Sequence, residues 1–170
     1  MKVFATAAVL ASALLLSACG FRPLYGMNGA EPGAQALFSS IYVETDDTEL
    51  VGYELRNAIM DLMHCTNDPR AAKYRLRFTV RQTREGVTIA PDAAITRYDY
   101  TLNVNYTLED AHSGAVITKG TESTLSAFDV VSSPYSTLVA QQSAQKTASQ
   151  DVASRLQIDL AVYFNQHAQR

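Results

Sequence analysis

The residues best suited to chemistry are cationic side chains that recur at every second position of one segment. Lys73, Arg75, Arg77 and Arg81 alternate with apolar residues or threonine, and a period of two places them on one face of a β-strand. Guanidinium groups offer paired N–H donors that match the oxygens of phosphates and carboxylates. We therefore predict an anion-binding row made of Arg75, Arg77 and Arg81.

The same row has a second interpretation. Asp99 and Glu109 lie on the next segment with strand periodicity, so the guanidiniums could pair with these carboxylates across the strands. Exposed pairs of this kind contribute only about 0 to 1 kcal/mol. Both interpretations stay open at this point, and they are compatible with each other.

No other constellation in the sequence supports catalysis. The three histidines, His64, His112 and His167, fall at a predicted helix end, in a turn and in the C-terminal tail. There is no nucleophile elbow, HExxH, CxxC or phosphate-loop motif. His64 and Cys65 lack further metal ligands nearby, so we expect Cys65 to be a small buried residue. We predict that the protein is not an enzyme. Its formal net charge of −3 does not favour binding to nucleic acid.

The N-terminus predicts export and lipidation. Lys2 precedes the apolar run Val3–Leu16 and small residues, as in a secretory signal, and the run is shorter than the about 20 residues of a membrane span. The stretch Leu16–Cys19 resembles the lipobox of bacterial lipoproteins. That resemblance implies cleavage after residue 18, and a diacylglycerol and an N-acyl chain on Cys19, which anchor firmly. By resemblance to enterobacterial lipoprotein sorting signals, Gly20 in place of aspartate favours the outer membrane.

The mature chain is predicted to hold a tether and one domain. Residues 19–36 contain two prolines and several glycines, which is typical of a segment without regular structure. Residues 37–168 are long enough for a single domain with a substantial core.

Periodicity predicts six elements in this domain. They are strands over Leu37–Glu44, Lys73–Arg81, Arg97–Leu108 and Ala115–Val131, and helices over Glu49–Cys65 and Pro134–Asn165. We expect Asp46–Thr48 to cap the first helix and Ser133 the second. The expected apolar helix faces are Val51, Leu55, Ile59, Leu62 and Met63, and Leu138, Val152, Leu156, Leu160 and Phe164.

The order β-α-β-β-β-α predicts the fold class. The two central strands are apolar on one face and polar on the other, so the helices must cover the apolar face. We predict an α/β (α+β) two-layer sandwich, with a four-stranded mixed sheet and both helices on one face. The Ala-, Ser- and Gln-rich segment Gln141–Gln150 of the last helix either packs closely or is solvated.

Several segments together resemble the lipopolysaccharide-assembly lipoprotein family LptE, of alphaproteobacterial type. Cys19–Gly26 is similar to that family's mature start, and Thr96–Leu108 looks like its third strand. Gly114–Val116 and Lys119–Thr121 sit where the family has a turn and a fourth strand, and Phe128–Ala140 resembles the start of its last helix. The likeness covers most of the mature chain. Gln141–Gln145 departs from it, because relatives are usually more charged there.

The resemblance implies a non-enzymatic outer-membrane lipoprotein that faces the periplasm. Such proteins sit inside the LptD-type β-barrel, help it to assemble, plug it and contact lipopolysaccharide. No cofactor is implied beyond the covalent lipid on Cys19. Lipid A phosphates would then be the anions for Arg75, Arg77 and Arg81. The alternative is an accessory envelope lipoprotein of another system, such as a lipid-transporting ABC system or a cell-wall synthase.

Overall fold

Alternating apolar and polar residues build a sheet with one buried face and one open face. The computed structural model describes residues 36–47, 49–89 and 95–167. Its strands are β1 (Ile41–Thr45), β2 (Tyr74–Ile89), β3 (Ile95–Asp110) and β4 (Val116–Asp129). They lie in the order β1-β2-β3-β4, with β1 parallel to β2 and the other pairs antiparallel. The mixed four-stranded sheet is therefore confirmed. The predicted signal peptide, Cys19 and most of the tether lie outside the described residues.

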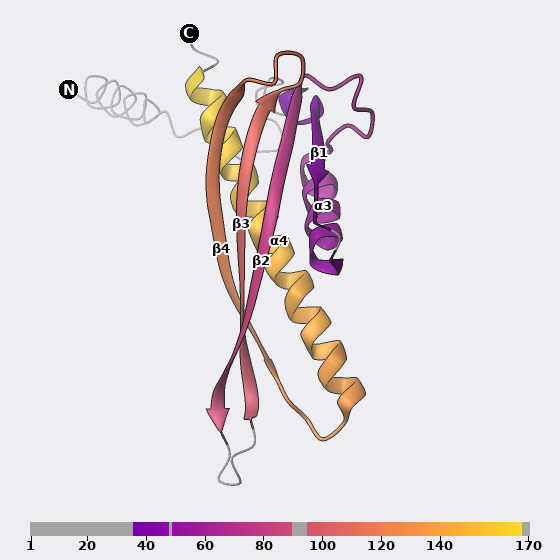
Figure 1. Ribbon diagram of the computed structural model, residues 1–170, viewed down its shortest axis with the longest axis vertical. Helices are drawn as coiled ribbons and strands as arrows, with labels where there is room; N and C mark the ends of the chain where they lie inside the picture. Colours follow the sequence, from indigo (N-terminus) through magenta and orange to yellow (C-terminus); the bar gives the residue numbers. More distant parts are fainter. Residues whose placement is uncertain (1–35, 48, 90–94, 168–170) are drawn as a thin grey trace, which may run out of the picture. The chain divides into compact units, whose positions relative to one another are not determined.

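Two helices cover one face of this sheet. Helix α3 (Leu50–Met63) packs against β1 and against α4 (Pro134–His167), and α4 lies along β4 and β3 (Figure 1). The two-layer arrangement and the element order β-α-β-β-β-α are as predicted. No helix in the described ranges is long and apolar enough to span a bilayer.

The core lies between the helices and the covered face of the sheet. Its fully buried members come from every element except β4: Ile41, Val43, Val51, Leu55, Ile59, Met63, Leu76, Tyr100, Leu102, Leu108, Leu156 and Leu160. Burial of one such aliphatic side chain stabilises the fold by about 1.5 to 3 kcal/mol. This layer fixes which face of each strand remains outside.

The first strand starts later than predicted. Residues 36–38 form a helical turn, and β1 begins only at Ile41. The Ser39 hydroxyl donates to the Ala36 carbonyl, and the Ser40 hydroxyl donates to the Leu37 carbonyl. Serine side chains that bond local backbone in this way favour turns over strands, which explains the error over residues 37–40.

Helix α3 differs from the prediction at its ends and on its face. The Asp47 carboxylate accepts the Glu49 N–H at 2.9 Å, but Glu49 is the N-cap and makes no side-chain capping bond. The helix ends at Met63, because His64 adopts a left-handed backbone with φ 53°. Leu62, predicted to be in the core, is 39% exposed.

Helix α4 starts at Pro134 as predicted, and the Ser133 hydroxyl accepts the Ser136 N–H at 3.4 Å. Leu138, predicted to be buried, is 50% exposed, since the first turns of α4 have few neighbours. The sequence left open whether the segment Gln141–Gln150 of this helix packs closely or is solvated, and its small residues decide this. Ala144, Ala148 and Ser149 are buried, so this segment packs closely against its neighbours rather than being solvated.

Strands β2 and β3 are longer than the alternation alone predicted. β2 continues past Arg81 to Ile89, and its register with β3 shifts after Gly86. β4 ends at Asp129 rather than Val131. The predicted turn near Gly114 is present, with φ 69° at that glycine and the Asp110 carboxylate accepting the Ser113 N–H at 2.7 Å.

Candidate anion-binding face

The predicted basic row lies on the open face of the sheet. Arg75 is opposite Glu109 across the β2–β3 ladder, Arg77 is opposite Thr107, and Arg81 is opposite Asn103. The residues between them point into the core, where buried Leu76 pairs with buried Leu108. Directly opposed residues share a face. The row therefore points away from the helices, and the structure brings its three arginines onto one surface.

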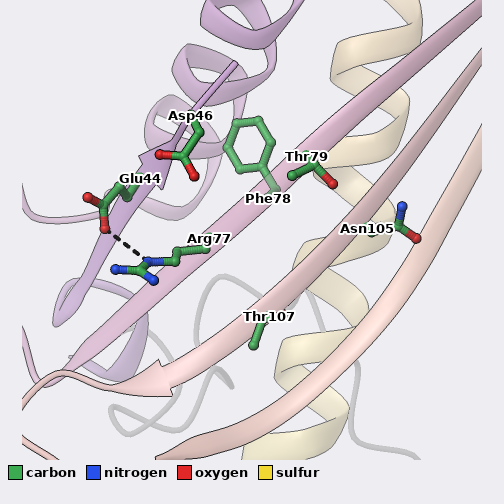
Figure 2. Close-up of a pocket in the computed structure, with 7 residues that line it drawn as sticks. All are labelled: Glu44, Asp46, Arg77, Phe78, Thr79, Asn105 and Thr107. Atoms are coloured by element: carbon green, nitrogen blue, oxygen red, sulfur yellow. Dashed lines mark hydrogen bonds and ion pairs between the residues drawn. The ribbon is translucent and has the colours of Figure 1, made fainter. Parts of the chain in front are cut away.

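Two of the three arginines are engaged by a carboxylate from β1. The Arg77 Nε lies 3.2 Å from Glu44 Oε2 (Figure 2), and the Arg75 Nε lies 3.5 Å from the same oxygen. Arg77 also approaches Glu109, at 3.9 Å. The hydrogen bond to Glu44, followed by the charge of Glu109, raises the pKa of Arg77 above its usual value. Glu44 therefore offsets the positive charge of Arg75 and Arg77.

The cross-strand interpretation is thus correct for Glu109 and wrong for Asp99. Asp99 stands opposite Glu85, several residues beyond the arginines. Glu44 was missed altogether, because its approach depends on the parallel pairing of β1 with β2, which joins segments distant in sequence. The available signal was weak: Glu44 follows Val43 and so falls on the polar side of β1.

Arg81 differs from its two neighbours. It is exposed and forms no ion pair with any described residue. Lys119 on β4 lies opposite Thr107 and is likewise unpaired within the described ranges. Arg97, near the far end of β3, pairs with Asp129 at 3.1 Å. Arg81 and Lys119 are therefore two cations of this face that are available to an external anion.

Hydroxyl and amide side chains fill the middle of the open face. Thr79, Asn105 and Thr121 form one row across three strands, and the Thr121 hydroxyl donates to Asn105 Oδ1 at 2.8 Å. Where β1 ends, a hollow of about 200 Å³ opens beside this row (Figure 2). Its lining comprises Glu44, Asp46, Arg77, Phe78, Thr79, Asn105 and Thr107. Such a surface can donate and accept hydrogen bonds over a broad area.

A second polar cluster lies on the helix side of β2. The Tyr100 hydroxyl donates to Gln82 Oε1 at 3.0 Å, and Gln145 of α4 donates to the same oxygen at 3.3 Å. Gln82 in turn donates to Glu49 at the start of α3. Burial raises the pKa of Tyr100 to about 12, so its hydroxyl stays protonated at neutral pH. This cluster ties both helices to the sheet.

The thiol of Cys65 is not activated for chemistry. Cys65 is buried as predicted, and burial raises the pKa of its thiol to about 11, which disfavours the nucleophilic thiolate. No group of three or more metal-ligating side chains comes together among the residues that the structure describes.

Comparison with models of protein families identifies the family to which the chain belongs. The model of the family described as LptE, lipopolysaccharide-assembly, matches residues 38–162, which include all four strands, α3 and most of α4. The chain belongs to the LptE family. It is therefore a member of a lipopolysaccharide-assembly lipoprotein family of the bacterial envelope, and the predicted resemblance is confirmed.

Solved lipoprotein structures resemble this LptE-family chain. A lipoprotein from Caulobacter crescentus is 28% identical with a TM-score of 0.66, covering 78% of this chain and 96% of its own. A minor lipoprotein from Acinetobacter baumannii (16% identity, TM-score 0.56, 74% and 92% covered) and rare lipoprotein B from Shewanella oneidensis (15%, 0.55, 75% and 98%) share the fold. No curated protein sequence matches significantly.

The glutamines that depart from the usual family pattern have defined roles in the structure. Gln145 is buried and bonds to Gln82 on β2, and Gln141 accepts a hydrogen bond from Arg84 at 3.0 Å. Both contacts link the first half of α4 to the sheet. In this LptE-family protein the uncharged segment is an internal contact of the fold.

Proposed function

We propose that this chain is the lipoprotein partner of an LptD-type outer-membrane barrel, and that it plugs the barrel and contacts lipopolysaccharide in transit. The observation that supports this most directly is the asymmetry of the sheet. One face is covered by α3 and α4, and the other presents hydroxyls, amides and unpaired cations. The interior of a large barrel is polar, and a face of this composition is suited to it.

The anchor belongs to the same proposal. Residues 1–18 act as a signal peptide, Cys19 receives the lipid, and residues 19–36 tether the single domain 37–168 at the periplasmic side of the outer membrane. The domain then works without catalysis, without a further cofactor and without nucleic acid. Family membership and the lipobox-like stretch Leu16–Cys19 support this organisation.

Arg81 is the leading residue for lipopolysaccharide contact in this proposal. Its guanidinium is not neutralised by a described carboxylate, whereas Arg75 and Arg77 share Glu44. A phosphate would have to compete with Glu44 for the latter two. The three arginines therefore form a graded site, with Arg81 engaged first and Arg75 and Arg77 strengthening the contact when Glu44 is displaced.

Crosslinking in cells tests the barrel assignment. A photoreactive residue replaces Ser123 on the open face, with Asn57 on the exposed side of α3 as the matched position. We expect Ser123 to give an adduct with a large outer-membrane barrel, in higher yield than Asn57. Adducts with inner-membrane transport or cell-wall synthesis proteins would instead favour the accessory lipoprotein of another system, which the fold alone does not separate. No adduct at either position would contradict the proposal.

A further inference from the structure

The outer edge of β2 is covered over only part of its length. β2 has 16 residues, and β1 pairs with five of them, Tyr74–Phe78. From Thr79 to Ile89, no strand within the described ranges pairs with this edge. Every second residue of such an edge directs its backbone N–H and C=O outward.

The end of β1, and with it the start of the uncovered edge, is fixed by two hydrogen bonds of Thr45. The Thr45 hydroxyl donates to the Phe78 carbonyl at 3.3 Å and accepts the Asp47 N–H at 3.1 Å. These two bonds end the β1 ladder and turn the chain toward α3, which begins at Leu50. β1 cannot lengthen along β2 without losing this turn.

The edge lacks the strongest features that protect edge strands. Proline and lysine, which commonly block edge strands, are both absent from Thr79–Val87, whose charged residues are Arg81, Arg84 and Glu85. All residues from Arg81 to Val87 are exposed. The register shift after Gly86 marks where the regular edge ends.

The open face indicates which side chains would complement this edge. Glu44 on β1 lies next to Arg77 on β2 and neutralises it. Arg81 is the next arginine along the same face, and there no β1 residue remains to supply a carboxylate. The hollow lined by Asp46, Phe78 and Thr79 (Figure 2) opens where the added segment would begin.

We propose that the free edge of β2, Thr79–Val87, binds an extended acidic segment of a partner protein as an added strand, with a partner carboxylate meeting Arg81. Backbone pairing provides the affinity and the carboxylate provides the specificity, as in other strand additions. The segment would continue the line of β1 and repeat the role of Glu44. This inference goes beyond the proposed function and requires neither the barrel nor lipopolysaccharide.

The test uses the full-length acylated protein in detergent micelles and three short synthetic peptides. The first alternates valine with glutamate, the second replaces glutamate with lysine, and the third is the acidic peptide with N-methylated backbone. We expect the acidic peptide to slow amide hydrogen exchange within residues 79–87. The lysine peptide should bind about tenfold more weakly or worse, and the N-methylated peptide should give no protection.

Two matched charge reversals assign the effect to the edge. Arg81→Glu should weaken the acidic peptide about tenfold and improve the lysine peptide, while Lys119→Glu, on the same face but on β4, should leave both unchanged. Equal effects of the two variants would overturn the proposal in favour of diffuse attraction. It would also be overturned by an edge that is protected without peptide, as a second copy or the protein's own tether would cause. A lipid phosphate at Arg81 would not protect backbone amides, so failure of this test differs from failure of the lipopolysaccharide contact.

Discussion

The hydroxyl end of Tyr106 lies directly over Gly120, its partner across the β3–β4 ladder. A Cβ at position 120 would sit 2.6 Å from the Tyr106 hydroxyl oxygen and 2.7 Å from its Cζ. The missing side chain lets the tyrosine pass over β4 and donate to Asp159 Oδ2 of α4, at 3.2 Å. Burial, and then the charge of Asp159, raises the pKa of Tyr106 to about 12, so the donor remains protonated.

Gly120→Ala should therefore destabilise the fold by overpacking. We expect a loss of about 1 to 3 kcal/mol in the free energy of unfolding, measured by urea denaturation. Tyr106→Phe, which removes only the hydrogen bond, should cost about 0.5 to 1.5 kcal/mol. In a Tyr106→Leu background the Gly120→Ala penalty should shrink, because the ring is gone. An unchanged penalty there would mean that backbone freedom at position 120 matters, and not the space taken by Tyr106.

The contact between β4 and α4 predicts a pH dependence. Desolvation, followed by a hydrogen bond with Asp159, raises the pKa of Glu122 above its usual value, and Arg155 partly opposes the shift. The folded state therefore holds the Glu122 proton more tightly than the unfolded state does. Its contribution to stability is present below the unfolded pKa of about 4.3 and is lost as the pH rises through the higher folded pKa.

Glu122→Gln should remove this dependence. We expect the variant to be more stable than the parent at pH 7, by less than about 1 kcal/mol because the site is partly exposed, and equal to it near pH 4. Unfolding in urea across this range measures the difference. Asp61→Asn, at an exposed position of α3, is the control for removal of a carboxylate elsewhere on the surface. A Glu122→Gln variant that is less stable at pH 7 would contradict this account.

The covered face of the sheet was predictable because it depends on a local period. Alternation in Tyr98–Leu108 placed Tyr100, Leu102 and Val104 together, and all three are buried. The corresponding alternation in Lys73–Arg81 placed the basic row on the opposite face of the sheet. Its partner Glu44 could not be predicted, since which strand lies beside β2 is decided by long-range packing and not by the pattern of either strand.

Helical spacing was less informative because it does not say where a helix meets its neighbours. Leu62 and Leu138 fall on the apolar faces of their helices but are largely exposed. In α4 the close contact is instead made by small residues, Ala144, Ala148 and Ser149. Small side chains allow the backbone of a helix to approach its neighbours closely, and hydrophobicity alone does not reveal such contacts.

Ser149 yields a prediction about this close contact. Its hydroxyl is fully buried and has no hydrogen-bond partner in the described part of the chain. A buried unsatisfied hydroxyl destabilises a fold by about 1 to 3 kcal/mol, so Ser149→Ala should raise the melting temperature. Ser149→Val, which adds volume at a packed site, should lower it. A destabilising Ser149→Ala would indicate that an ordered water satisfies the hydroxyl.

Lipidation at Cys19 has its own test. Cys19→Ser should remove radiolabelled palmitate from the protein and shift the chain from the membrane fraction to the soluble periplasm, because the anchor depends on acyl burial. The fold should be unaffected, since the core is formed between Phe38 and Phe164. Cys65→Ser is the matched control and should retain the label. Palmitate retained on Cys19→Ser would contradict the lipobox interpretation.

The graded arginine site predicts opposite effects from two single changes. Arg81→Glu should weaken lipopolysaccharide binding about tenfold or more, because it removes a cation that no described carboxylate neutralises. Glu44→Gln should strengthen binding, because Arg75 and Arg77 lose their shared carboxylate. Both effects should diminish with rising salt, as expected for exposed charges. Binding of purified full-length protein to immobilised lipopolysaccharide measures them.

Reversal of all three arginines separates binding from folding. Arg75, Arg77 and Arg81 changed together to glutamate should abolish lipopolysaccharide binding while lowering the melting temperature by only a few degrees, because exposed ion pairs contribute about 0 to 1 kcal/mol each. Reversal of Lys119 alone, on the same face of the sheet, reports how far binding depends on general positive charge. Unchanged binding together with a lowered melting temperature would assign the row to strand pairing with Glu44 and Glu109 and leave the lipid contact to be sought on another surface.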